Sequence, residues 1–355
     1  AFPPLRGAPS GEPRGGRSGW DAPGVVAVVR VASAADLLAV PAVEAAADEL
    51  FRARGVPGLP APPPAALRAE AWRVLVAGRP TLSRPVSALL ADPAVRVETV
   101  AAGPRWADAA RSTTRVGGFP VPRPMPGGAP ETADPAWRAA WREASARVGA
   151  AVDAVLDTAP ALTAARLARD VVAALPQGAL LVLGSSTPVR DVDRLAVPRP
   201  DLVVLANRGV AGIDGTISTA VGAALVHGGP SFALMGDLTF LHDLTGLVTG
   251  DGEPVPDVTV VVPDNDGGGI FAQLEPGEDR HARDYRRVFG TPHGRDLVVV
   301  AEALGWAASR ITAPGDLAGA LALGGPRVVV VGTDQRAEAE LARELRAAAG
   351  RALAP

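Results

Sequence analysis

Short apolar runs alternate with longer amphipathic segments over the second half of the chain. The apolar runs predict strands at 179–184, 201–207, 231–237, 258–264 and 327–333. The segments beside them predict helices at 136–156, 162–175, 212–228, 240–250 and 335–349. Because fully apolar strands that alternate with helices are typical of a parallel sheet covered on both faces, we expect a doubly wound α/β fold.

The first half is interrupted by proline and glycine and predicts a smaller α/β unit. Strands are expected at 25–29, 73–78 and 95–100, and helices at 43–54 and 83–91. Two Pro/Gly-rich stretches read as connections between folded units. We therefore divide the chain into a tail or linker (1–24), a second, smaller α/β domain (25–116), a linker (117–135) and the domain of the large parallel sheet (136–355).

The composition of the 355-residue chain excludes several classes of function. The net charge of −3 gives no reason to expect a nucleic-acid surface. The sequence has neither Cys nor Lys, which excludes disulfides, thiolate chemistry and lysine Schiff bases. No apolar run approaches the roughly 18 to 20 residues of a membrane span, and the start lacks a signal-peptide pattern. A cytoplasmic location is the expectation.

Four predicted strands end in polar, glycine-bearing turns, at 184–186, 207–209, 236–237 and 264–269. Ligands of an open parallel sheet bind outside the carboxyl ends of its strands, so these turns should line one site. Asp237 offers a carboxylate, Asn265 an amide oxygen, and the following glycines allow a backbone carbonyl to approach closely. These are hard oxygen ligands that suit Mg²⁺ beside a phosphate, and a helix from about Thr239 would direct its N-terminus there. The pattern favours a metal diphosphate site, although either turn alone is usually only a loop.

The same residues resemble a known family. A Gly-Asp pair followed by a strand that ends in Asn is similar to the signature of thiamine-diphosphate enzymes. More narrowly, the segments "ANRGVAGIDGTISTAVGAAL", "GDLTFLHDLTGL", "NDGGGIF", "FGTPH" and "GRPTLSRPVSALL" resemble the 2-succinyl-5-enolpyruvyl-6-hydroxy-3-cyclohexene-1-carboxylate synthases (the MenD family) of menaquinone biosynthesis. The resemblance covers the family's middle and C-terminal domains, and it is poor over residues 24–68.

The resemblance implies a role for each matching position. Implied metal ligands for Mg²⁺ or Mn²⁺ are Asp237, Asn265 and the Gly267 carbonyl. Implied thiamine-diphosphate contacts are Ser185, Ser186, Gly212, Ile213, Gly236, Asp237, Leu238, Thr239, Asn265, Gly267 and Ile270. Implied catalytic or substrate-side residues are Arg208, Arg190, Ser186, Arg84, Phe271, Ile270 and Leu274.

The family implies a transferase reaction and a partner set. It decarboxylates 2-oxoglutarate and adds the resulting succinic semialdehyde carbanion to isochorismate. Both substrates are dicarboxylates, which arginine forks bind bidentately. The family's active site is shared between subunits, so a homodimer or homotetramer is expected, with no nucleic acid and no membrane span.

Several features limit the resemblance. The start "AFPPL" resembles the segment just after the family's N-terminal domain, so the activating glutamate of that domain has no counterpart here. We expect the chain alone to be incomplete as an enzyme and prone to aggregate. Asp264 and Asp266 stand where at least one Asn is expected, and extra carboxylates beside a diphosphate would weaken its binding unless they point away or coordinate through the metal.

Other readings stay open, and the histidines contribute little to the choice. The alternatives are a non-catalytic fragment that only binds Mg-diphosphate, another thiamine-diphosphate carboligase or decarboxylase, and a nucleotide-binding domain. We expect His242 to pack or cap within its helix. We place His227, His281 and His293 at the surface or in loops.

Overall fold

Two separate parallel sheets form the framework of the protein. The computed structural model describes residues 26–30, 73–77, 82, 84–100, 108, 111–117, 135–159, 161–207 and 212–354. The smaller sheet has the order β1-β2-β3-β4. Its strands are β1 (Val26–Arg30), β2 (Arg73–Ala77), β3 (Arg96–Val100) and β4 (Thr113–Gly117), and α3 (Arg84–Ala91) precedes β3.

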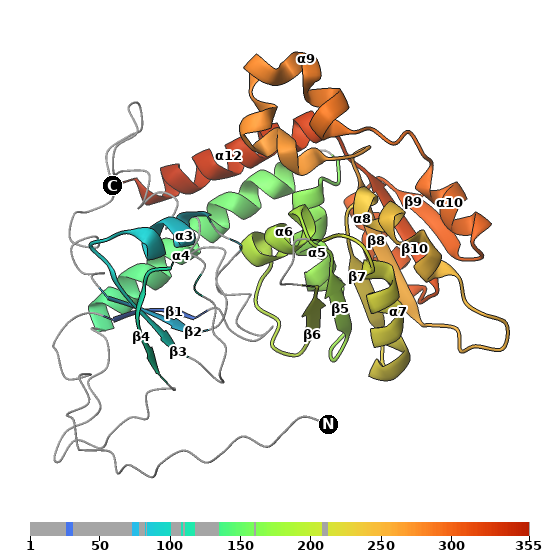
Figure 1. Ribbon diagram of the computed structural model, residues 1–355, viewed down its shortest axis with the longest axis horizontal. Helices are drawn as coiled ribbons and strands as arrows, with labels where there is room; N and C mark the ends of the chain where they lie inside the picture. The colour runs from blue at the N-terminus through green and yellow to red at the C-terminus, as the bar shows by residue number, and fades with distance from the viewer. Residues whose placement is uncertain are drawn as a thin grey trace, which may run out of the picture.

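The larger sheet has six parallel strands in the order β6-β5-β7-β8-β10-β9 (Figure 1). Its strands are β5 (Leu180–Leu183), β6 (Val203–Ala206), β7 (Ser231–Leu234), β8 (Val258–Asp264), β9 (Ala307–Ile311) and β10 (Arg327–Gly332). The chain first moves outward from β5 to β6 and then crosses back over β5 to β7. The direction of winding therefore reverses between β5 and β7, which is the place where α/β sheets bind ligands.

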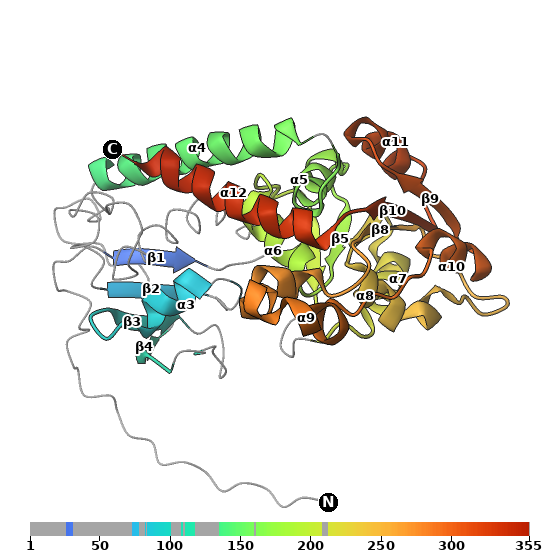
Figure 2. The ribbon, with the colours of Figure 1, turned by 90° about the horizontal axis from the view of Figure 1, so that it is seen from above.

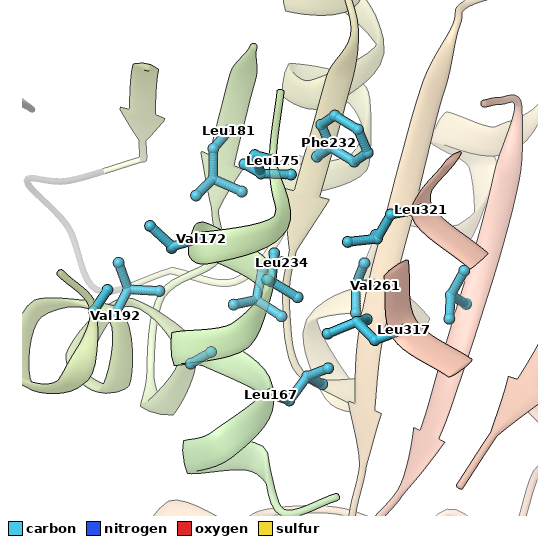
Figure 3. Close-up of a cluster of buried hydrophobic side chains, with 14 of the residues drawn as sticks. Leu167, Val172, Leu175, Leu181, Val192, Phe232, Leu234, Val261, Leu317 and Leu321 are labelled. Carbon is cyan, nitrogen blue, oxygen red and sulfur yellow. The ribbon is translucent and has the colours of Figure 1, made fainter. Parts of the chain in front are cut away.

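Helices cover both faces of the larger sheet, as the alternating pattern predicts. The helices are α4 (Pro135–Thr158), α5 (Ala164–Ala174), α6 (Thr187–Leu195), α7 (Thr216–His227), α8 (Asp237–His242), α9 (Ala282–Tyr285), α10 (Leu297–Ala303), α11 (Leu317–Ala322) and α12 (Gln335–Leu353). One apolar cluster joins the sheet to α5, α6 and α11, and Figure 3 shows part of it. A second cluster joins the opposite face to α7, α8 and α10.

The period-two geometry of a strand explains how one short run serves both clusters. Leu181 and Leu183 of β5 pack into the first cluster, whereas Leu180 and Val182 pack into the second. All four side chains are at most 2% exposed. A strand buried on both faces has no polar position, which is why the sequence shows an uninterrupted apolar run. The doubly wound α/β fold is confirmed.

Helices α4 and α12 lie side by side and extend from the larger sheet toward the smaller one (Figures 1 and 2). They begin and end close to the predicted limits of 136–156 and 335–349. Within the described part of the chain, no helix combines the length and the apolar character that crossing a membrane would require.

Other expectations are wrong or incomplete. The predicted helix 240–250 is only the short α8 followed by a 3₁₀ turn at Leu244–Leu247. The apolar pattern did not predict β4, β9, α6, α9, α10 or α11. Edge strand β9 was not predicted because it has no apolar run, since only Ile311 of its five residues is buried. The predicted helix 43–54 lies outside the described residues, and the division into domains stays a prediction.

Candidate functional site

The sheet order places the four strand ends that precede the predicted turns at one edge. Strands β6, β5, β7 and β8 are consecutive neighbours and run parallel, so their carboxyl ends lie together. Gly184 is required where β5 and β7 end, because a Cβ at this residue would lie 2.7 Å from the Cβ of Met235. The glycine therefore allows the two strand ends to approach each other closely.

Asp237 is an almost fully buried carboxylate at this edge. It begins α8 directly after β7 and is 2% exposed. Its Oδ2 accepts hydrogen bonds from the backbone N–H groups of Asn265 (3.1 Å) and Gly267 (2.8 Å). Burial raises the pKa of this carboxyl, and the amides of Gly267 and Leu238 oppose that rise. The helix begins at Asp237, two residues earlier than expected, so the acid itself occupies the first turn.

The loop after β8 is shaped by glycines at which larger residues would collide with the backbone. Gly267 has a φ of 134°, and a Cβ there would overlap the carbonyl oxygen of Gly290. A Cβ at Gly268 would likewise overlap the carbonyl of Phe289. The Gly268 amide donates to the Gly290 carbonyl at 2.7 Å. The loop is thus pressed against the turn at Arg286–Gly290, and only glycine permits that approach.

The residues present fit a divalent cation. Oδ1 of Asn265 is buried and accepts no hydrogen bond from any residue that the structure describes. A buried amide oxygen without a donor is costly unless a cation or another group satisfies it. Together with the Asp237 carboxylate, it offers the hard oxygen ligands that Mg²⁺ prefers. Asp237, Asn265 and the Gly267 carbonyl could hold the metal, as predicted, and this assignment stays a prediction.

The two extra carboxylates have partners of their own. Asp264 Oδ2 lies 3.6 Å from Nη1 of Arg310, and Asp264 Oδ1 accepts a hydrogen bond from the Asp266 amide at 3.3 Å. Asp266 has a φ of 60°, and its Oδ1 accepts from the Gly294 amide at 2.7 Å. The Asp266 side chain is therefore held toward the loop that follows the Arg286–Gly290 turn.

His293 lies in a loop, one of the two expected locations, but not at the surface. It lies in the loop before α10, but its side chain is only 10% exposed. Its Nε2 is 3.4 Å from Oδ2 of Asp237 and 3.4 Å from Oδ1 of Asp264. The three side chains could gather around one ion, since their ligand atoms all lie within 4.8 Å of one another. Only the fragment "FGTPH" pointed to this residue in the sequence, and nothing in its spacing placed it beside Asp237.

The end of β5 supplies the predicted serines. Ser185 is buried, and its Oγ donates to the Asn207 carbonyl at 3.3 Å. Ser186 precedes α6 with a φ of 77° and a ψ of −134°, a strained backbone for a residue with a side chain. Such strain costs about 1–3 kcal/mol and clusters at ligand sites. Arg190 donates from Nη1 to the Ser186 carbonyl at 2.7 Å, which holds this turn.

The turn between β6 and α7 is anchored on both sides. Asn207 Nδ2 donates to Oγ1 of Thr219 at 3.0 Å, and Thr216 Oγ1 donates to the Ile213 carbonyl at 3.1 Å. Asp243 accepts from both the amide and the hydroxyl of Ser218. Gly212 and Ile213 are half-buried at the start of this turn. Arg208 lies outside the described residues, as does the side chain of Arg84 at the start of α3.

The predicted apolar residues follow the loop 265–268 after β8. Ile270 and Phe271 lie in the 3₁₀ turn Gly269–Gln273, and Leu274 follows it. Ile270 and Leu274 are half-buried, whereas Phe271 is 37% exposed. The ring of Phe271 lies 5.5 Å from that of Phe289, centroid to centroid, so it packs on the turn that supports the loop. Of the remaining implied contacts, Thr239 is buried, while Gly236 and Leu238 are half-buried.

Helix α12 connects the loop after β8 with the start of α5. Nε2 of Gln335 donates to the carbonyls of Asp266 (3.2 Å) and Gly290 (3.3 Å). Its Oε1 accepts from the Tyr285 hydroxyl at 3.4 Å. One turn later, buried Glu338 accepts from the Ala164 amide at 2.7 Å. The sequence pattern predicted this helix but gave no signal for either residue.

The comparisons with known proteins agree with this arrangement. Residues 192–331 match the family described as "Thiamine pyrophosphate enzyme, C-terminal TPP binding domain". A 2-succinyl-5-enolpyruvyl-6-hydroxy-3-cyclohexene-1-carboxylate synthase of Nocardia farcinica (strain IFM 10152) is 47% identical over 278 residues, 78% of this chain and 50% of that protein. The synthase of the same name from Thermobifida fusca (strain YX) is 48% identical over 284 residues, 79% of this chain and 50% of that protein.

The chain spans about half the length of the curated relatives it matches. The matching family covers α7, β7 and β8, and with them Asp237, Asn265 and Gly267. The chain is therefore a homologue of the C-terminal half of these synthases and carries the TPP-binding domain of the thiamine pyrophosphate enzymes.

Proposed function

We propose that this chain is the diphosphate- and metal-binding part of a thiamine-diphosphate-dependent transferase of menaquinone biosynthesis. One observation carries the proposal. Buried Asp237 and Oδ1 of Asn265, which has no hydrogen-bond partner among the described residues, lie at neighbouring strand ends inside a matched TPP-binding domain. We infer that Asp237, Asn265 and the Gly267 carbonyl hold Mg²⁺ or Mn²⁺. The metal would in turn hold the diphosphate.

The chain's own residues would orient the cofactor and the substrates. Thiamine diphosphate, when bound, supplies the electron sink for a decarboxylation. Ser185 and Ser186 lie at the neighbouring strand end, where their polar groups could bind phosphate or substrate. Ile213, Ile270 and Leu274 would supply apolar contacts to the ring system. The exposed face of Phe271 would do the same.

We propose 2-oxoglutarate and isochorismate as the substrates, because the named relatives are synthases of the corresponding product. Arg190, Arg208 and Arg84 are the arginines proposed to meet their carboxylates, since a guanidinium fork binds a carboxylate bidentately. For Arg190, the structure shows Nη1 bound to the Ser186 carbonyl, which places the guanidinium at the end of β5. A homodimer or homotetramer and a cytoplasmic location remain parts of the proposal.

The test is calorimetric titration of thiamine diphosphate into the chain with and without Mg²⁺. Binding should require Mg²⁺ and should be lost, by about 100-fold or more in affinity, in Asp237→Ala. Asp251→Ala is the matched control, because Asp251 is an exposed aspartate in the loop between α8 and β8. Equal binding by both variants, or no binding by a chain with a cooperative unfolding transition, would contradict the assignment.

A further inference from the structure

The imidazole of His293 is the polar group at this edge that the proposed metal set does not use. It approaches from the loop before α10, whereas Asp237 and Asp264 come from the ends of β7 and β8. Its Nε2 is buried and has no hydrogen-bond partner among the described residues. The two nearest polar atoms are the carboxylate oxygens of Asp237 and Asp264, each 3.4 Å away.

The other ring nitrogen determines where the proton of the imidazole resides. Nδ1 of His293 accepts a hydrogen bond from the backbone N–H of Arg295 at 3.0 Å. An amide hydrogen needs a lone pair, so Nδ1 carries no proton in this arrangement. The proton of the neutral ring must then sit on Nε2, because the hydrogen bond of one nitrogen fixes the role of the other.

The Nε2–H group therefore points between two carboxylates that repel each other. Oδ2 of Asp237 already accepts from two backbone amides. Oδ1 accepts one, from the Leu238 amide at 2.6 Å. The positive end of an Nε2–H group 3.4 Å from Oδ2 would hold that oxygen in place and leave the remaining lone pair of Oδ1 for a cation. The same N–H lies between the Asp237 and Asp264 carboxylates. The other oxygen of Asp264 lies 3.6 Å from Nη1 of Arg310.

Direct ligation of a metal by His293 conflicts with this geometry. The ligand atoms of Asp237, Asp264 and His293 are close enough to surround an ion. A metal on Nε2 would require the proton to move to Nδ1, where it would face the Arg295 N–H at 3.0 Å. The nearest acceptor there, Oδ1 of Asp266, is 3.8 Å away and already accepts from the Gly294 amide. The cost of opposing two donors in a partly buried loop favours the hydrogen-bonding role.

We propose that His293 is a positioning residue of the metal site: the Arg295 amide fixes its tautomer, and its Nε2–H orients the Asp237 carboxylate and separates it from Asp264. The proposal deepens the proposed function and rests on it for the identity of the metal ligand. The orientation of hydrogen-bonded ligands by such neighbours is typically worth 10- to 100-fold in metal affinity.

The first experiment reads the tautomer without any metal. The chain has four histidines, so selective ¹⁵N-histidine labelling gives few signals, and His293→Gln identifies those of residue 293. We expect the long-range ¹H–¹⁵N spectrum to show a bare Nδ1 and a protonated Nε2. The opposite tautomer would overturn the proposal, and this result does not depend on whether the chain binds a cofactor.

The second experiment measures Mn²⁺ affinity in the presence of thiamine diphosphate, from the electron paramagnetic resonance signal of free Mn²⁺. Gln places an N–H near the position of Nε2, whereas Asn replaces only the Nδ1 side of the ring. His293→Gln should therefore bind within about threefold of the unsubstituted chain, and His293→Asn should bind about 10- to 100-fold more weakly. His281→Asn is the control, because His281 is exposed.

The outcomes separate the inference from the proposed function. Equal affinities of the Gln and Asn variants would overturn the positioning role. A directly coordinated ¹⁴N in the spin-echo modulation of bound Mn²⁺, absent in His293→Gln, would overturn it in favour of ligation. If the unsubstituted chain binds no Mn²⁺ at all, the proposed function fails, and the tautomer still decides whether the donor lies between the two carboxylates.

Discussion

Two buried acids, Asp237 at the end of β7 and Glu338 on α12, sit in regions of opposite character. Burial raises the pKa of both carboxyls. Asp237 is surrounded by donors: backbone amides of Leu238, Asn265 and Gly267 all bond to it. Glu338 accepts from the Ala164 amide and has a second acid, Asp191, near enough to raise its pKa further.

The difference shows how surroundings decide what a buried acid can do. Donors around Asp237 stabilise its charged form, and a charged carboxylate is what a divalent metal needs. Burial is the largest cause of the rise in the Glu338 pKa to about 7, the Ala164 amide opposes it, and the carboxylates of Asp191 and Asp334 add to it. The first region therefore suits the proposed metal, whereas the second joins α12 to α5 with a carboxyl that is half neutral near pH 7.

The largest expected effect comes from Gly267→Ala, which would displace one of the backbone amides that donate to Asp237. The new Cβ would overlap the Gly290 carbonyl, and the φ of 134° is itself strained for alanine. We expect the free energy of unfolding to fall by about 3–5 kcal/mol, or the loop to rearrange with loss of metal binding. Denaturant titration and Mn²⁺ binding would measure both.

Gly252→Ala is the matched control for that change. Gly252 also has a positive φ, 78°, but no atom lies within 4 Å of its virtual Cβ. Backbone strain alone should cost about 1 kcal/mol there, with metal binding unchanged. Similar losses in the two variants would show that the contact with Gly290 is not what requires glycine at 267.

The second prediction, of intermediate size, concerns how Glu338 makes the free energy of unfolding depend on pH. The unfolded chain loses the Glu338 proton near pH 4.5 and the folded chain near pH 7. Between these values the folded state binds more protons, so this group's contribution to stability is full below pH 4.5 and is lost as pH rises toward 7. The shift corresponds to roughly 3 kcal/mol.

Glu338→Gln keeps an oxygen acceptor for the Ala164 amide and removes the titration. Between pH 5 and pH 8, we expect its free energy of unfolding to fall by about 2–3 kcal/mol less than that of the unsubstituted chain. Glu340→Gln, exposed on the same helix, should leave the pH dependence unchanged. Identical pH profiles for Glu338→Gln and the unsubstituted chain would mean that the buried acid ionises normally.

The smallest expected effect concerns Gln335, which lies three residues before Glu338 and connects the two regions. Its side-chain amide donates to the carbonyl of Asp266, in the loop after β8, and to that of Gly290, in the turn against which this loop packs. Gln335→Met has a similar size but no donor, and it should cost about 1–2 kcal/mol of stability. Thermal unfolding would measure this, with Arg336→Met as the exposed neighbour control. A loss no larger than the control's would mean that these long hydrogen bonds contribute nothing.

Prediction from the sequence was strongest where residues have a repeating environment. Strands β5, β7, β8 and β10 were found because burial on both faces makes most of their residues apolar. Edge strands β4 and β9 were missed for the opposite reason, since most of their residues are partly exposed. The extent of α8 was overestimated because the apolar residues after Phe240 continue a helical pattern while the backbone turns at Asp243.

For the candidate site, the sequence placed Asp237, Asn265 and the serines of the β5 turn at strand ends, and sheet order brought those ends together. It could not place His293, whose ring reaches Asp237 from a loop separated from it by β8, several short helical turns and α9. No local pattern encodes such a contact, because it depends on how the Arg286–Gly290 turn packs against Gly268.

The sequence by itself determined the parallel α/β sheet, its polar strand ends and the oxygen ligands they offer, because these follow from local alternation of apolar and polar residues and from side-chain chemistry. The tertiary structure alone decided which ends are neighbours, that Gly267 must pass the Gly290 carbonyl, and that two buried acids differ in their surroundings. Those features depend on distances between segments far apart in the chain, and only packing of the whole fold sets such distances.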